Sequence, residues 1–214
     1  MLFRSQIGEQ LEPKLVGSWI GVWGGKVTTG WHFWDPQPWA KVEAMFGTHE
    51  AKFQLKKWVE DHHIGQIERF TQSIGEEPFS EIEFAMPGKT VDEQLATMSA
   101  AFDRFTGSPI DPNIVARFRE ASVPQFGLSL RIRGGQIVRV GGLAPGLALA
   151  TIKGVCEDAK IGVDGKLDKM IGALGEGIVR VEYGRAGERA GVDVYLEPSE
   201  PAPKHPAPPP TVAN

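Results

Sequence analysis

Four copies of a β-hairpin pattern dominate the sequence and limit the folds that are open to it. In each copy, two strand-like runs flank a short turn that contains glycine. The turns are centred near residues 24, 76, 135 and 188, at intervals of roughly 50 to 60 residues. Because strands joined by tight turns run in opposite directions, successive hairpins of this kind predict an antiparallel sheet.

Two short helical segments are predicted between each hairpin and the next. Start and stop signals support them, such as the capping-box pattern of Thr90 with Glu93 and the glycine at position 107. The predicted helices cover residues 36–46, 49–63, 91–106, 113–122, 145–160 and 164–174. The element order is therefore ββ-αα-ββ-αα-ββ-αα-ββ, in which antiparallel hairpins alternate with helix pairs, and the expected fold class is α+β.

Every predicted hairpin has one apolar face and one face that carries polar or charged residues. In the second hairpin, Ile82, Phe84 and Met86 alternate with Glu81 and Glu83. Amphipathic helices are expected to cover the apolar face. Two geometries satisfy this pattern: an antiparallel barrel ringed by helices with a charged lumen, or an open two-layer sheet with its polar face in water.

The fourth hairpin separates its residues in the same way. In the simplest register, Val181 and Tyr183 belong to the apolar face. The reverse face then carries Arg180, Glu182, Asp193, Tyr195 and Glu197. Glu182 and Asp193 lie directly opposite each other, where like charges repel. We therefore expect an arginine nitrogen within salt-bridge distance of at least one of these carboxylates.

The third hairpin, "FGLSLRIRGGQIVRVGG" (126–142), places arginines among residues that otherwise belong in a core. A three-residue turn, Arg133-Gly134-Gly135, is predicted because it puts Arg131 and Arg139 on one face and the leucines on the other. In this register Ser129 lies opposite Arg139. Paired glycines are interpreted as hairpin turns throughout the chain.

Residues 15–197 are predicted to form a single α+β domain. Residues 1–14 are an uncertain N-terminal segment, and the proline-rich residues 198–214 are expected to be a disordered tail. The net charge of -4 argues against a nucleic-acid partner, and no apolar run is long enough to cross a membrane. With one cysteine, Cys156, and no secretory signal, the expected location is cytoplasmic.

No cofactor or metal is expected. No glycine-rich nucleotide fingerprint leads from a strand into a helix, and the "EDHH" run (60–63) lacks the spacing of a metal-binding motif. The run from residue 19 to residue 39 holds five of the six tryptophans. It is either a stacking platform for an aromatic ligand or, as we favour, the apolar contact between the first hairpin and its helices.

The order of elements resembles the αββα repeat of the aromatic prenyltransferases, an antiparallel barrel that is ringed by helices. The resemblance covers residues 15–197 in element order, with four units recognisable here. In that family, basic residues and tyrosines of the lumen hold an allylic diphosphate. The residues of matching type in this chain are Arg131, Arg139, Arg180, Tyr183 and Tyr195.

Two classes of function remain open. The first is a small-molecule site on the charged face, for example that of a transferase. In such a site the arginines and tyrosines of matching type would bind an anionic substrate, and Glu182 and Asp193 would be catalytic. The second is a non-catalytic interaction protein, similar to an inhibitor or antitoxin, that presents a Trp-rich or charged surface. The partners are accordingly a small anionic or aromatic ligand in the first case and a protein in the second.

Overall fold

The computed structural model describes residues 16–23, 26–33, 35–45, 50–74, 78–121, 123–161, 165, 169, 178–187 and 189–197. The predicted N-terminal segment, the proline-rich tail, most of the helix predicted at 164–174 and the glycines of the first hairpin turn lie outside these residues. The described helices are α2 (Trp39–Met45), α3 (Glu50–Asp61), α4 (Val91–Thr106), α5 (Pro112–Ala121) and α6 (Leu149–Asp158).

Eight strands form one antiparallel sheet in the order β1-β2-β5-β6-β7-β8-β9-β10. These strands are β1 (Val16–Trp23), β2 (Lys26–Phe33), β5 (Arg69–Ile74), β6 (Ser80–Ala85), β7 (Gly127–Arg133), β8 (Gln136–Pro145), β9 (Ile178–Ala186) and β10 (Arg189–Glu197). Each pairs only with its sequence neighbours in this sheet, so the α+β fold of consecutive hairpins is confirmed.

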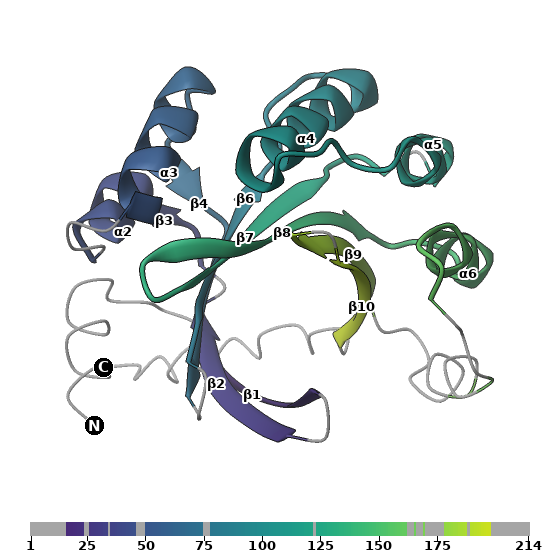
Figure 1. The fold of residues 1–214 in the computed structure, drawn as a ribbon, viewed down its shortest axis with the longest axis horizontal. Helices are drawn as coiled ribbons and strands as arrows, with labels where there is room; N and C mark the ends of the chain where they lie inside the picture. Colours follow the sequence, from purple (N-terminus) through teal and green to yellow (C-terminus); the bar gives the residue numbers. More distant parts are fainter. Residues whose placement is uncertain are drawn as a thin grey trace, which may run out of the picture.

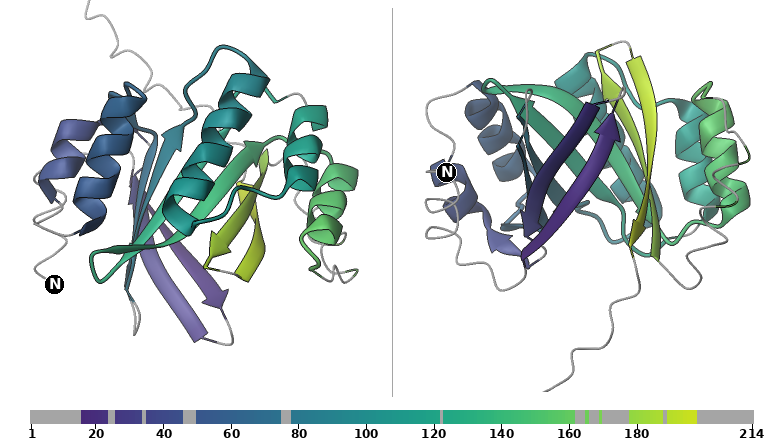
Figure 2. Two further views of the ribbon diagram at one scale, coloured as in Figure 1. Left: turned by 45° about the horizontal axis from the view of Figure 1, so that its top comes forward. Right: turned by 90° about the horizontal axis from the view of Figure 1, so that it is seen from below.

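The sheet is open but strongly curled. Strands β1 and β10 lie at its two edges, and within the described residues they do not pair with each other. All the described helices lie on the convex side, while the concave side faces away from them (Figure 1). Seen from below, the β1–β2 hairpin crosses the middle of the view and the β9–β10 hairpin lies to its right (Figure 2). We call the surface of the sheet that the described helices leave uncovered the concave face.

One predicted helix begins later than expected. The prediction placed its start at residue 36, but α2 begins at Trp39. Gln37 and Pro38 instead form the short strand β3 (Gln37–Pro38), which pairs with β4 (Gln66–Ile67). Asp35 Oδ2 accepts a hydrogen bond from Gln37 Nε2 at 2.6 Å, so the residue expected to cap the helix supports the bend before this strand.

The predicted boundaries of α4 are confirmed by its cap geometry. Thr90 Oγ1 accepts from the Glu93 amide at 3.2 Å, and Glu93 Oε2 accepts from the Thr90 amide at 3.1 Å, which completes the capping box. At the other end Gly107 adopts a left-handed conformation with φ of 72°. None of the helices in the described part of the chain is long and apolar enough to cross a membrane.

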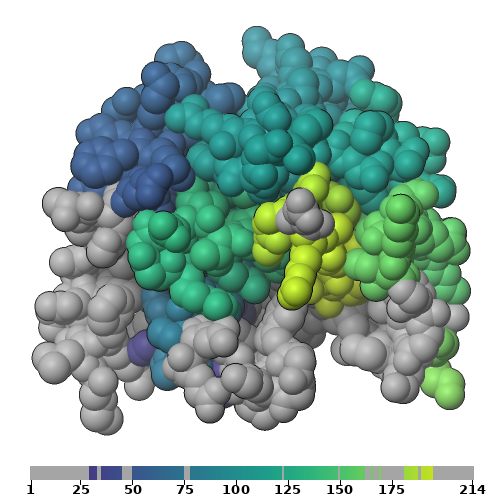
Figure 3. All heavy atoms as spheres, in the orientation of Figure 1, coloured from purple at the N-terminus to yellow at the C-terminus, as the bar shows by residue number. Residues whose placement is uncertain are grey.

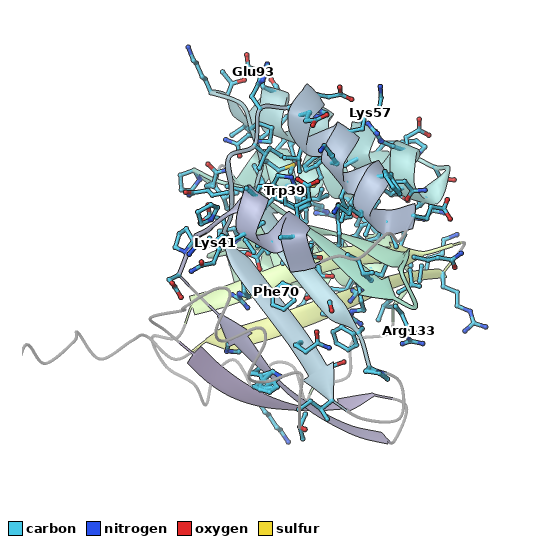
Figure 4. All side chains as sticks on the ribbon, turned by 90° about the vertical axis from the view of Figure 1, so that its left-hand side faces the viewer. Trp39, Lys41, Lys57, Phe70, Glu93 and Arg133 are labelled. Carbon is cyan, nitrogen blue, oxygen red and sulfur yellow. The ribbon has the colours of Figure 1, made fainter. Side chains whose placement is uncertain are left out.

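The hydrophobic core lies between the convex face of the sheet and the helices. Phe84 of β6 is at its centre, with its ring 6.0 Å from that of Trp39 and 5.4 Å from that of Trp58. In Figure 4, Trp39 points from α2 towards the sheet, whereas Lys57 and Arg133 project outward. The helices form a continuous cover over this side of the sheet (Figure 3).

The predicted turn of the third hairpin is wrong, although the assignment of Arg131 and Arg139 to one face and of the leucines to the other is correct. Gly134 and Gly135 have φ of 57° and 78° and form a two-residue turn, so Arg133 lies opposite Gln136. Between Arg131 and Ile132 the register shifts, and Val138 is the extra residue of a β-bulge. The shorter turn alone would move the side chains of β8 to the opposite face, and the extra residue of the bulge moves them back. Arg139 therefore keeps its predicted face but lies opposite Arg131 rather than Ser129.

Replacement of Phe84 by alanine should strongly destabilise the fold. Phe84 is 0% exposed, so Phe84→Ala leaves a cavity and should lower the free energy of unfolding by about 3–5 kcal/mol. Phe53 on α3 is 64% exposed, and Phe53→Ala should change it by no more than about 0.5 kcal/mol. Urea denaturation measures both, and equal losses would contradict the location of the core.

Candidate functional site

The concave face carries its polar residues in three rows that run across the strands. Each row consists of residues directly opposite one another in the register. The first row is Thr71, Glu81, Arg131 and Arg139. The second is Arg69, Glu83, Ser129, Gly141, Gly184 and Gly191. The third is Ala85, Gly127, Leu143, Glu182 and Asp193.

Arg131 is held by a carboxylate of the neighbouring strand. Its Nε and Nη2 atoms lie 2.8 Å and 2.7 Å from Glu81 Oε2. Its guanidinium carbon also lies 4.2 Å from the centre of the Phe79 ring, which is a cation–π contact. A second such ion pair lies on β5 and β6, where Arg69 Nε is 3.4 Å from Glu83 Oε2.

Arg139 bridges the two carboxylates of the fourth hairpin. Its Nη2 atom lies 3.1 Å from Glu182 Oε1, and its Nη1 atom lies 2.5 Å from Asp193 Oδ2. The side chains of Arg139, Glu182 and Asp193 are only 11%, 1% and 16% exposed, so this charge is largely removed from water. The predicted arginine beside the Glu182 and Asp193 pair is confirmed.

Glycines of the middle row make this contact possible. Arg139 belongs to the first row and its partners to the third, so their side chains meet above the row between them. A Cβ atom at Gly184 would overlap the Arg139 guanidinium, and one at Gly141 would overlap the Glu182 carboxylate. The absence of side chains at these two positions therefore provides the space for the ion pairs.

Burial leaves two carboxylates of the cluster harder to ionise. It raises the pKa of Glu81 above its ordinary value, and the negative charge of Glu182 adds to this rise, against the opposing charges of Arg131 and Arg139. Burial also raises the pKa of Asp193, where Arg139 opposes the shift and Glu182 adds to it. Three carboxylates share two arginines in this cluster, so a proton on one of them relieves repulsion.

A pocket of about 200 Å³ lies at one end of the concave face, where β6 ends, β7 begins and β8 ends. Five of its lining residues belong to the rows or their continuation: Glu83, Ala85, Gly127, Leu143 and Pro145. Phe84, Phe126, Glu68 and Gln125 complete the lining. It therefore combines apolar walls with two carboxylates, as small-molecule sites commonly combine apolar surface with a few polar groups.

The predicted site residues are not all brought together. Tyr183 lies on the opposite, helix-covered face, where it is buried and its ring is 6.0 Å from that of Phe102. Burial raises the pKa of its hydroxyl. The backbone of Arg180 pairs with Tyr195 and with Pro145, but the side chains of Arg180 and Tyr195 lie outside the described part of the structure.

The remaining candidates have structural surroundings. Of the five tryptophans between residues 19 and 39, Trp39 is buried in the core, as the structural interpretation predicts, and Trp31 is half-buried, while the other three side chains lie outside the described part of the structure. Trp58 of α3 is also buried, and His62 stacks on it with ring centres 4.9 Å apart. Cys156 is buried, which raises the pKa of its thiol. Among the described residues, no three His, Cys, Asp or Glu side chains are grouped so that they could hold a metal ion.

Sequence reasoning placed Glu81 and Glu83 on the charged face but did not name them as site residues, and it missed the glycine row. Gly141 and Gly142 were expected to be a turn, but both lie inside strand β8. Glycine is unfavourable within a strand and commonly marks a position that something approaches closely. Glycines at 184 and 191, also inside predicted strands, were the available signal for a crowded face.

Comparison of the chain with protein-family models and with curated proteins finds no match.

Replacing glycines of the second row with alanine should destabilise the fold at crowded positions and have little effect at open ones. Gly184→Ala places a methyl group against the Arg139 guanidinium and should lower the free energy of unfolding by about 1–3 kcal/mol. At Gly191, its partner on β10, no atom lies within 4 Å of the place that a Cβ atom would take. Gly191→Ala is therefore the matched control and should change the free energy of unfolding by at most about 0.5 kcal/mol. Urea denaturation distinguishes the two, and equal effects would contradict the crowding of the row.

The raised pKa values of Glu81 and Asp193 predict that the fold becomes less stable as the pH rises. The folded state binds these protons more tightly than the unfolded state, so their stabilising contribution is complete below the ordinary pKa values of 4.5 and 3.8. This contribution is lost as the pH rises through the higher pKa values of the folded state. The melting temperature of the unmodified chain should therefore fall between about pH 4.5 and neutrality, and the double substitution Glu81→Gln and Asp193→Asn should abolish this fall.

The control for this experiment is Glu120→Gln, a substitution of an exposed carboxylate on α5. It should leave the pH profile of the melting temperature unchanged. A double variant with the same profile as the unmodified chain would show that the two buried carboxyls are not the source of the pH dependence.

Proposed function

We propose that the chain is a small-molecule-binding protein whose ligand occupies the pocket at the β6–β7–β8 end of the concave face. The observation that carries this proposal is the position of the pocket. Leu143, one of its apolar wall residues, belongs to the row that contains Glu182 and Asp193, so the pocket adjoins the ion pairs of these carboxylates.

The ion pairs of the concave face are costly for the stability of the fold, and this cost supports a functional role for that face. Charges buried on a sheet are rarely more stabilising than apolar residues of similar size, and they concentrate where a site needs them. Here the fold buries Glu182, leaves the side chains of Glu81 and Asp193 only 15% and 16% exposed, and keeps glycines at positions 141 and 184 to make room. Departures from local stability rules of this kind are expected at functional sites.

A transferase that holds a diphosphate-like substrate is the finer form of this proposal. Arg131 and Arg139 would bind the anion, with Glu182 and Asp193 as acid and base. This form is less favoured, because each arginine already lies within ion-pair distance of a carboxylate that an anion would displace. Its test is pyrophosphate, which should raise the melting temperature unless Arg131→Ala and Arg139→Ala are introduced.

An interaction protein is the alternative from a different class. Its sequence basis was an exposed Trp-rich or charged surface. In the described part of the chain, the exposed large apolar residues are Phe53 on α3 and Ile74 on β5. Single exposed residues of this kind are normal on protein surfaces and need no partner.

Filling the pocket should abolish ligand binding. Ligand-observed NMR with a set of small fragments of mixed charge should detect binders, and Ala85→Leu, which adds bulk to the pocket wall, should weaken them by about tenfold or more. Ala116→Leu is the matched control, because Ala116 is exposed on α5, on the other side of the sheet. Fragments that bind equally well to both variants, or an absence of any binder, would contradict the proposal.

A further inference from the structure

We infer that the pocket selects a small cationic ligand, an ammonium or amidinium group on a compact apolar body, over neutral and anionic ligands of the same shape. This inference rests on the proposed function and adds to it the charge of the ligand. It follows from the lining of the pocket, from the way its two carboxylates are positioned, and from the space beside its apolar wall.

The charge of the pocket lining is negative. Glu68 and Glu83 contribute carboxylates, and none of the nine residues that line the pocket in the described structure is a lysine, arginine or histidine. A cation that enters would exchange water for charge-assisted hydrogen bonds, which are about twice as strong as neutral ones. An anion of equal size would meet repulsion from both carboxylates.

The backbone holds the two glutamate residues of the pocket next to each other. The Glu68 amide donates to the Glu83 carbonyl at 2.8 Å, which fixes the end of β4 against β6. Glu68 Oε1 also accepts from Gln66 Nε2 at 3.2 Å, so its side chain is directed by a neighbour. The ligand would thus meet an arrangement that already exists in the free protein, and little ordering is required when it binds.

Glu83 lies at the edge of the pocket and is paired with an arginine. Its Oε2 atom lies 3.4 Å from Arg69 Nε, and its side chain is 17% exposed, so it is partly screened from water. A ligand cation at Glu83 would share the carboxylate with Arg69, which makes Glu68 the first contact expected for the charged end of the ligand.

The apolar body of the ligand has a defined place. Leu143 and Gly127 lie opposite each other in the third row, and a Cβ atom at Gly127 would lie 3.2 Å from the Leu143 side chain. The glycine therefore allows the Leu143 side chain to lie directly against the backbone of β7, where it forms part of the pocket wall. With Pro145 and Ala85, this surface can cover a ring or short alkyl chain, while the charged end reaches Glu68 and Glu83.

The test uses three probes of matched shape: benzylamine, benzyl alcohol and benzoate. Their dissociation constants are measured by NMR titration of the full chain at pH 7 and low salt. We expect benzylamine to bind about tenfold or more tightly than the other two. Glu68→Gln and Glu83→Gln should each weaken benzylamine severalfold and leave benzyl alcohol unchanged, whereas Glu120→Gln, on α5, should change neither.

The outcomes separate the two levels of the proposal. If benzyl alcohol or benzoate binds as tightly as benzylamine and Ala85→Leu still blocks it, the pocket is a binding site but the charge selection is wrong. If no probe binds, both proposals are wrong.

The charge selection can still be tested if one of the two glutamate variants fails to fold. If Glu83→Gln unfolds, Glu68→Gln decides, because the Glu68 side chain accepts its hydrogen bond from Gln66 in an exposed contact. Such a contact contributes little to stability, so this variant should stay folded. Unchanged benzylamine binding by folded Glu68→Gln would then overturn the charge selection.

Discussion

Arg139 meets Glu182 and Asp193 on a surface from which most water is excluded, and the organisation of the concave face depends on this contact. Two conditions must hold together for it to form. The pairing of β8, β9 and β10 has to bring the first and third rows to either side of the second, and the second row has to lack side chains at Gly141 and Gly184. If one partner were lost, the remaining charge would be buried without compensation, which is far more costly than the pair itself.

The two faces of the sheet contribute to stability in opposite ways. The convex face packs residues such as Phe84 and Leu130 against the helices and supplies the apolar burial that drives folding. The concave face contains carboxyl groups whose raised pKa values indicate an unfavourable environment for their charge. The fold tolerates this cost because the helix-covered core is extensive, and such a surplus is what allows a protein to maintain a site that is locally unfavourable.

The pocket and the ion pairs are neighbours with separate chemistry. Glu182 and Asp193 are engaged by Arg139, whereas Glu68 and Glu83 line the open space at the end of the strands. A ligand in this space is expected to use the second pair of carboxylates and to leave the first in place. The buried cluster then serves as a rigid support that fixes the curl of β8 to β10, and rigid support is what a small site requires for selectivity.

Local features of this protein were determined by its sequence alone, because they depend on residues close together in the chain. Alternation separated Ile82 and Phe84 from Glu81 and Glu83, and the capping box of Thr90 located the start of α4. The two-residue turn at Gly134 was mistaken because a bulge restored the phase that the turn had shifted. Only the tertiary structure decided that Arg131 would pair with Glu81, 50 residues away, that strand glycines would lie beneath Arg139, and that the ends of three strands would enclose a pocket. These contacts join different hairpins, and their register is set by packing of the whole sheet against its helices, which no local pattern encodes.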